Sequence, residues 1–291
     1  MHFSDIHENQ FKYNPSVITH IENMAFQLTY RNQWPGNSDF VTYDGAFIVS
    51  SEQIKSSFGI YLLRDTQGGG IINNTGVSLI YGYNTRIAHD LSFSAGLEAT
   101  CSIYSTHFSG LTFENNLIPQ LPLDQSIYFF NFASGFEISY RDRQRYGLAV
   151  RNLGALQSSQ HTTSELTVDA SYMGRFTLSG GYNPYDTYLV TLVNVSASRN
   201  NNELLYGGRI KYSVVYGGIY ARQNIRFEFD ALILLLGTQL GNVSIFYTYD
   251  LNLSGASARF SNLASHEVTF LYDMQYKRKS KKKGAIKCPK I

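Results

Sequence analysis

The stretch Ile225–Leu253, IRFEFDALILLLGTQLGNVSIFYTYDLNL, decides the fold. Its first half has an apolar side chain at every second position: Ile225, Phe227, Phe229, Ala231, Ile233 and Leu235. Arg226, Glu228 and Asp230 lie between the first of these residues. After a turn at Gln239–Asn242 the alternation resumes, with Val243, Ile245, Tyr247, Tyr249 and Leu251 on one face. A period of two predicts two β-strands joined as a hairpin.

The charged residues between the apolar ones indicate the environment of this hairpin. An apolar face opposite a polar face, over about ten residues per strand, is typical of a transmembrane β-barrel, with lipid on one side and a lumen on the other. We therefore predict that the apolar set faces lipid and that Arg226, Glu228 and Asp230 line the lumen. A large soluble all-β domain is the alternative, but it would place these charges in its core.

Composition supports the membrane interpretation. The 291 residues include 22 Tyr, 19 Phe and 24 Gly, with only 16% charged residues, which suits strands and tight turns. No window approaches the roughly 20 consecutive apolar residues of a membrane helix. In lipid, a chain without such helices must close its hydrogen bonds as a barrel. We predict an all-β, antiparallel barrel of a bacterial outer membrane, spanning residues 24–276 as one domain. Met1–Ser4 shows no export signal, so the sequence is expected to begin near the mature terminus.

Turn signals between alternating stretches divide the barrel into strands. The predicted strands are 24–33, 39–49, 56–65, 74–86, 90–104, 127–140, 144–153, 165–179, 186–198, 203–212, 214–221, 225–238, 242–253 and 266–276. These are fourteen, an even number as in single-chain bacterial barrels. Twelve strands is the alternative, because the turn near Ser213 has no Gly, Asn or Pro and because 186–198 is apolar on both faces.

Loop lengths predict the orientation. The long connections are 66–73, 105–126, 154–164 and 254–265, and the connections between them are short. Outer-membrane barrels have short periplasmic turns and long extracellular loops, so an even strand count places both termini in the periplasm. Residues 1–23 precede the first strand and lie either in the lumen or on the periplasmic rim. They and the loop 105–126 are the segments that could plug the lumen.

Charged residues are expected on the lumen face of many strands. They are Arg31, Glu98, Arg151, Asp169, Arg175, Arg209, Lys211, Arg226, Glu228 and Asp230. They form either a hydrated, ion-paired interior that holds the shape of the barrel or a conduction path. A barrel of this strand number is wider than the eight-stranded kind, whose interior side chains fill it, so its lumen needs a plug or serves as a pore.

The last residues differ in character from the barrel. The segment 277–291, KRKSKKKGAIKCPKI, has eight basic residues and no acidic one, which leaves 16 basic residues (24 less 8) against 22 acidic ones elsewhere. Such a tail is a solvated terminus or a docking segment for anionic lipid or an acidic protein partner. Nucleic acid is not expected as a partner in the periplasm. The candidate partner-binding residues are Lys277, Arg278, Lys279, Lys281, Lys282, Lys283, Cys288 and Pro289.

Catalytic and metal-binding motifs are absent from the sequence. There is no nucleophile elbow, phosphate-binding loop or dinucleotide fingerprint, and the seven histidines show no metal-ligand spacing. His266 and Glu267 are neighbours in a strand and therefore face opposite sides. We predict no catalytic residue, no metal and no cofactor. A hydrolase using a serine and a histidine is a minor alternative, and a transporter for hydrophobic small molecules is the main one.

Several motifs in order resemble the PorP/SprF family of type IX secretion outer-membrane proteins. They are HFSDI at 2–6, YNPSV at 13–17, YRNQWPG at 30–36, YGGIYAR at 216–222, LILLLG at 232–237, YTYDLNLS at 247–254, SHEVTFLY at 265–272 and IKCPKI at 286–291. The signature positions are Asn14, Pro15, Tyr30, Arg31, Trp34, His266, Cys288 and Pro289. The resemblance implies a barrel of about fourteen strands that works with periplasmic secretion components in secretion or gliding. It also implies export or surface anchoring of an adhesin-type client, and it assigns no catalytic residue.

Overall fold

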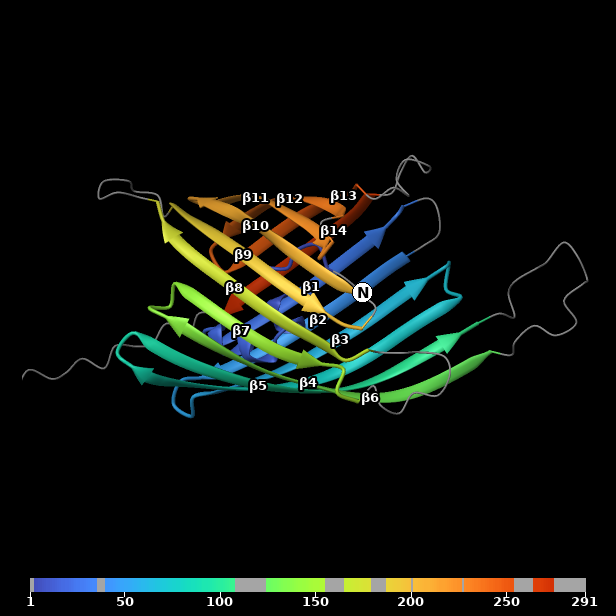
Figure 1. Ribbon diagram of the computed structural model, residues 1–291, viewed down its shortest axis with the longest axis horizontal. Coiled ribbons are helices and arrows are strands. Elements are labelled where there is room, and N and C mark those ends of the chain that lie inside the picture. The colour runs from blue at the N-terminus through green and yellow to red at the C-terminus, as the bar shows by residue number, and fades with distance from the viewer. Residues whose placement is uncertain are drawn as a thin grey trace, which may run out of the picture.

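The computed structural model describes residues 3–35, 40–107, 124–154, 165–178, 187–199, 201–226, 228–253 and 264–274. Fourteen antiparallel strands follow one another around a closed barrel, and β1 pairs with β14 to complete it (Figure 1). The all-β barrel and the strand count of fourteen are confirmed. Within the described residues, no helix is long and apolar enough to cross a membrane.

The strand bounds lie within a few residues of those predicted. They are β1 (Met24–Gln33), β2 (Phe40–Ser51), β3 (Ser56–Gln67), β4 (Ile72–Ala88), β5 (Leu91–Thr106), β6 (Gln125–Tyr140), β7 (Gln144–Arg151), β8 (Thr167–Thr177), β9 (Thr187–Ala197), β10 (Asn202–Tyr212), β11 (Val215–Asn224), β12 (Phe229–Leu240), β13 (Val243–Asn252) and β14 (Ala264–Met274). The turn between β10 and β11, which had no sequence signal, is made by Ser213 with a φ of 56°.

The period of two sets the two faces of the wall. In β1, Phe26, Leu28 and Tyr30 are exposed on the outside, whereas Gln27, Thr29 and Arg31 between them are buried. In β13, Ile245 and Tyr247 point outward as predicted. Because successive side chains of a strand point to opposite faces, one apolar and one polar set per strand give a lipid-facing and a lumen-facing surface.

The predicted faces of β12 are wrong. Ala231, Ile233 and Leu235 are almost fully buried inside the barrel, and Leu234 and Leu236 are the residues exposed outside. Arg226 and Glu228 precede the strand and are exposed.

A β-bulge explains the error on β12. Arg222 pairs with Ala231, but the next residue, Gln223, pairs with Phe229, so that Asp230 is an extra residue. One extra residue reverses the face of every side chain beyond it. The side counted from Arg226, Glu228 and Asp230 was therefore the wrong one for the rest of the strand.

The two ends of the barrel differ. At one end, here called the terminal rim, β1 begins and β14 ends; the opposite end, here called the loop rim, holds the connections after the odd-numbered strands. Residues 3–23, here called the N-terminal segment, contain two short 3-10 helices, η1 (Gln10–Lys12) and η2 (Pro15–His20). These two helices, dark blue in Figure 1, lie among the strands. Helix η2 contacts β2, β3, β4, β5 and β6.

Candidate functional site: the filled lumen

The N-terminal segment runs along the inside of the barrel. Ser4 lies beside Arg31 and Asp250, which are close to the loop-rim ends of β1 and β13. From there the chain passes through η1 and η2 and reaches the start of β1 at the terminal rim. Phe3, Ile6, Phe11 and Ile18 are all buried. The segment therefore occupies the interior along much of its length.

A buried ion-pair network holds the start of this segment. Arg31 donates to Glu267 at 3.1 Å and to Asp250 at 3.3 Å, and its guanidinium also contacts the Ser4 hydroxyl. Glu267 accepts the backbone N–H of Ser4 at 2.8 Å and that of Asp5 at 3.1 Å. Arg31 and Glu267 are direct partners across β1 and β14. Glu267 thus fixes two backbone N–H groups of the segment, and Arg31 and Asp250 fix the Ser4 hydroxyl.

Two more ion pairs join the segment to other parts of the wall. Glu8 accepts from Arg209 of β10 at 2.8 Å, and Lys12 donates to Asp44 of β2 at 2.7 Å. The Lys12 ammonium also lies 3.2 Å from the centre of the Phe3 ring. Buried charges are tolerated when they are paired and hydrogen-bonded, and both pairs meet this condition.

Burial and these charges change the acidities of the segment. Burial, together with the negative charges of Glu8 and Glu267, raises the pKa of Asp5 to about 7. Burial, together with the Arg209 guanidinium, lowers the pKa of His7 to about 4. Burial alone would raise the pKa of Glu8, but Arg209 and His7 lower it to about 2. At neutral pH, therefore, His7 is neutral and Glu8 is charged.

An apolar cluster packs the segment against β9 to β13. Ile6 and Tyr13 from the segment contact inward side chains of these strands: Leu192, Leu205, Tyr216, Tyr220, Ile233, Leu235 and Phe246. This cluster explains why β12 turns apolar residues inward: they face the segment instead of water.

A row of glycines forms the opposite wall. Gly82, Gly96 and Gly135 are direct cross-strand partners on β4, β5 and β6. A β-carbon at Gly82 would lie 2.7 Å from the Thr19 side chain, and one at Gly96 would lie 2.6 Å from the Ser16 Cα. One at Gly135 would collide with the Asn14 amide. We call these three residues the glycine track. The segment lies directly on it, with its backbone against Gly96 and its side chains against Gly82 and Gly135.

Asn14 and Pro15 determine how η2 starts. The Asn14 side chain caps the helix by accepting from the backbone N–H of Ser16 at 3.0 Å, and Pro15 occupies the first helical position. The side-chain nitrogen of Asn14 donates to the backbone oxygen of Phe136 at 3.2 Å. An Asn cap followed by Pro is a strong helix start. Asn14 therefore ends one part of the segment and attaches the next to β6.

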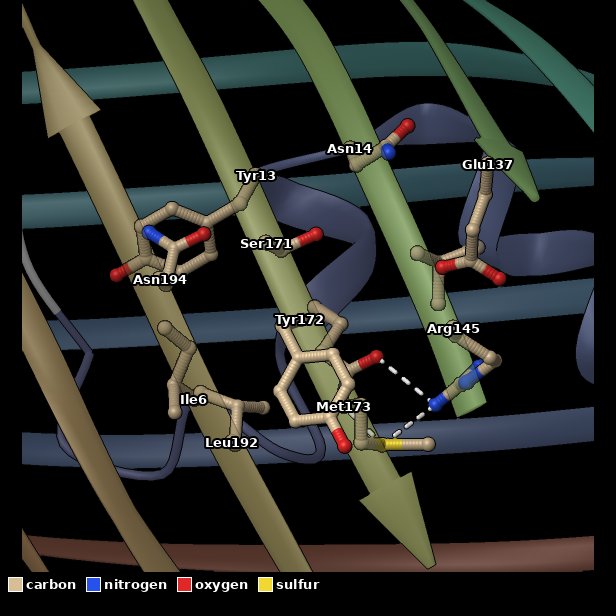
Figure 2. A pocket seen from close by; sticks show the side chains of 12 residues that line it. Ile6, Tyr13, Asn14, Glu137, Arg145, Ser171, Tyr172, Met173, Leu192 and Asn194 are labelled. Atoms are coloured by element: carbon tan, nitrogen blue, oxygen red, sulfur yellow. Dashed lines mark hydrogen bonds between the residues drawn. The ribbon is translucent and has the colours of Figure 1, made fainter. Parts of the chain in front are cut away.

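A small cavity remains between the segment and β6 to β9 (Figure 2). Its volume is about 20 Å³, the space of about one water molecule. Figure 2 shows Tyr13 and Asn14 above it and the Arg145 guanidinium pointing toward it, with bonds to Gln10 and Met173. Glu137, beside this cavity, contacts His20.

The signature residues lie in three places. Asn14, Pro15 and Arg31 are inside the barrel. Tyr30 and His266 face outward on β1 and β14, where the Tyr247 hydroxyl lies 2.7 Å from the His266 Nδ1. Trp34, just beyond β1, has a φ of 59° and packs its ring 5.2 Å from Phe40.

The predicted lumen charges are mostly inside. Those that line the interior are Arg31, Glu98, Arg151, Asp169, Arg209, Lys211 and, at the terminal rim over Tyr188, Arg175. Asp230 is at the bulge and pairs with Arg222 at 2.6 Å. The prediction for Arg226 and Glu228 is wrong, because both belong to the β11–β12 connection.

Several charged partners in the interior are not among the predicted lumen charges, although the alternation places Asp250 on the polar face of its strand. Asp250 and Glu267, on the inward faces of β13 and β14, are the main anions of the network, and Asp44 and Glu137 bind the segment elsewhere. The period of two was the signal that could have found them, because each lies at an inward position. The tail candidates Lys277 to Pro289 and the loop 108–123 lie outside the described residues.

Catalytic chemistry finds little support in this interior. In the part of the chain that the structure describes, no three His, Cys, Asp or Glu side chains are grouped so as to hold a metal ion. His266 and Glu267 face opposite sides of β14, as predicted: Glu267 is buried inside and His266 contacts Tyr247 outside.

The family description "Type IX secretion system membrane protein PorP/SprF" matches residues 1–272. The chain is a member of the PorP/SprF family. No curated protein matches it in sequence. Family and fold together make it a bacterial outer-membrane barrel of the type IX secretion system and point to a role without catalysis.

Solved structures resemble this PorP/SprF barrel in fold. The toluene transporter TbuX of Ralstonia pickettii is 9% identical, with a TM-score of 0.53, and the match covers 91% of this chain and 93% of that one. The toluene transporter TodX of Pseudomonas putida is 9% identical, with a TM-score of 0.49, over 90% of this chain and 91% of that one. At this identity, the TbuX likeness concerns the architecture alone.

Proposed function

We propose that this PorP/SprF barrel is closed by its own N-terminal segment and serves as a non-enzymatic docking platform of the type IX machinery. It supports export or surface anchoring of an adhesin-type client and binds periplasmic secretion components through the basic tail. The observation that supports this proposal most is the filled lumen: ion pairs, an apolar cluster and the glycine track all hold the segment inside a wall that is fully paired.

The orientation follows from the connections. Apart from the longer β8–β9 connection, the terminal rim carries short turns, and the longest connections, β5–β6, β7–β8 and β13–β14, lie at the loop rim, which favours a periplasmic terminal rim. The tail 277–291 follows β14 and would then enter the periplasm. Ser4, in contrast, lies toward the loop rim inside the lumen, so the two ends of the chain are not equivalent.

A transporter for hydrophobic small molecules is the competing function. It needs an apolar path through the lumen or the wall. Each strand is hydrogen-bonded to both neighbours, and the interior holds the buried charges of Arg31, Asp250 and Glu267 in the region where such a path would run. These observations favour the docking platform.

The test compares the full chain with a variant lacking residues 277–291. Both are purified in mild detergent from the native membrane, and the co-purifying proteins are identified by mass spectrometry. We expect the full chain to recover periplasmic components and a large secreted client, and the truncated chain to lose the periplasmic ones. Because each exposed ion pair contributes only about 0.2–1 kcal/mol, this recovery should fall with salt.

A matched control distinguishes the contribution of the basic side chains of the tail from that of its last residues. Lys277, Arg278, Lys279, Lys281, Lys282 and Lys283 are replaced by glutamine, while Cys288 and Pro289 stay. Heat-dependent gel migration checks that each barrel is folded. If the truncated chain recovers its periplasmic partners at full yield, the tail is not the docking segment. If the full chain instead recovers no protein and conducts ions or binds lipid, the transporter is favoured.

A further inference from the structure

A second, larger cavity opens at the loop rim, and no described residue of the N-terminal segment lines it. It has a volume of about 280 Å³ and lies between the start of β10, the end of β11 and the start of β12. Glu203, Arg222, Gln223, Glu228 and Asp230 line it, together with neighbouring asparagines. The proposed role of the tail does not involve this cavity.

The β-bulge of β12 shapes this cavity. Arg222 and Gln223 are neighbours in β11, yet they are only 9% and 4% exposed. Adjacent side chains of a regular strand point to opposite faces. The register shift between them, with Asp230 as the extra residue opposite, changes this local geometry. Bulges are frequent beside active sites because they change the direction in which side chains point.

The charge around the cavity is negative. Three carboxylates, those of Glu203, Glu228 and Asp230, line it, against the single guanidinium of Arg222. Arg222 already donates to Asp230 at 2.6 Å and to Asp250 behind it at 3.3 Å. Its positive charge is therefore shared between Asp230 and Asp250, and the Glu228 carboxylate, bonded to the neutral Asn224 amide, adds a further negative charge to the lining.

A buried hydrogen-bond acceptor provides a second, independent observation. The Gln223 Oε1 accepts no hydrogen bond from the described residues, although the side chain is almost fully buried. Glu228, by contrast, is exposed, and its carboxylate accepts from the Asn224 amide at 2.7 Å. Leaving a buried polar atom unpaired is unfavourable, so Gln223 requires a donor from elsewhere.

We infer that this cavity binds an organic cation with several N–H donors, namely the guanidinium or ammonium group of a polypeptide side chain. The negative lining attracts the charge, while Gln223 Oε1 and the Glu228 carboxylate accept its N–H groups. A guanidinium matches several acceptors at once because its donors form a rigid fork. The described lining offers no grouped ligand set for a metal ion, which favours an organic cation.

The test measures binding of three small probes to the full chain in detergent by calorimetry. They are Nα-acetyl-arginine amide, Nα-acetyl-lysine amide and the neutral Nα-acetyl-citrulline amide. We expect the arginine probe to bind about tenfold or more tightly than the citrulline probe, a factor that corresponds to about 1.4 kcal/mol. Its affinity should decrease as the salt concentration rises.

Two variants locate the site. Glu228→Gln keeps the shape of an exposed side chain and should weaken the arginine probe about fivefold or more, because a charged hydrogen bond becomes a neutral one. Glu52→Gln, at an exposed carboxylate of the terminal rim, should change nothing. Gln223→Leu should also weaken binding, and Glu228→Gln decides the matter if that variant fails to fold. The inference would be overturned if the arginine and citrulline probes bound equally well, or if Glu228→Gln bound the arginine probe as tightly as the parent protein does. Binding of calcium in place of the probes would also overturn it.

Discussion

The N-terminal segment meets two unlike walls of the same barrel. Its beginning, at Ser4 and Glu8, is held by charges of β1, β10 and β14. Its end, η2, lies on the glycine track of β4 to β6, three neighbouring positions at which the wall has no side chain. The first contact depends on electrostatic pairing, and the second depends on the absence of atoms.

The difference shows what each wall can tolerate. A buried ion pair fails when one partner is removed, because the other charge is left without compensation. A glycine contact has no partner to lose and fails only when an atom is added. The charged wall, formed by β1, β10 and β14, therefore determines the position of the segment along the barrel. The glycine track determines how closely the segment approaches β4, β5 and β6.

Removing the segment removes both contacts and should give the largest effect. We expect a variant lacking residues 1–20 to form ion-conducting pores in planar bilayers, because a wall of fourteen strands encloses more space than its own side chains fill. The full chain and the variant lacking residues 277–291 should remain silent under the same conditions. A silent 1–20 deletion that is still folded would show that the segment does not close the lumen.

Arg31→Met removes a positive charge from the charged part of the wall that holds Ser4. It leaves Glu267 buried near Ser4 without its guanidinium, while Asp250 keeps only Arg222 as a partner. We expect a loss of about 3–5 kcal/mol in the free energy of unfolding, the range for breaking a buried pair from one side. Denaturant unfolding in detergent, followed by the fluorescence of the single Trp34, measures it. Arg64→Met, at an exposed arginine on the outer side of β3, is the control and should cost less than about 1 kcal/mol.

Gly96→Ala adds a methyl group to the glycine track. The added β-carbon would collide with the backbone of Pro15 and Ser16, which cannot move aside as a side chain could. We expect a loss of about 1–3 kcal/mol, the usual effect of overpacking. Gly217→Ala is the matched control, since nothing lies within 4 Å of a β-carbon there. Similar stabilities of the two variants would mean that the segment does not lie on the track.

The sequence predicted the number and positions of the strands better than it predicted which of their side chains face the lumen. Fourteen strands followed from alternation and turn signals, and even the weak turn at Ser213 is where it was expected. The faces of β12 were inverted, because Ala231–Leu236 is apolar on both sides and its orientation was counted from the charges before it. A bulge at Asp230 cannot be detected by counting residues.

The site was predictable only in part. Alternation placed Arg31 and Arg209 inside, but it could not name their partners Glu267 and Glu8, since these depend on strand register and on the path of the segment. The glycine track depends on register too: Gly82, Gly96 and Gly135 are far apart in sequence and become neighbours only when β4, β5 and β6 pair. The period of the sequence determines a face, whereas a contact requires the paired sheet.

The smallest effect concerns Asp5, at the charged wall. Its pKa is raised to about 7 from the ordinary 3.8, first by burial and then by Glu8 and Glu267. The folded state therefore binds a proton that the unfolded state has already lost, so this group makes the protein less stable as pH rises from about 4 to about 7. Asp5→Asn removes the titration while keeping the acceptor for the Glu8 backbone N–H.

We therefore expect Asp5→Asn to match the parent protein at pH 4 and to exceed its stability increasingly toward pH 7. One pKa unit corresponds to about 1.4 kcal/mol, and a gain of this order should appear as a higher denaturation midpoint. His7, whose pKa is lowered to about 4, acts in the opposite direction, since its contribution is lost as pH falls from about 6.5. Because both proteins contain His7, its effect cancels in their difference. A difference that stays constant between pH 4 and 7 would mean that Asp5 is ionised in the folded barrel and that the charged wall is less buried than its contacts indicate.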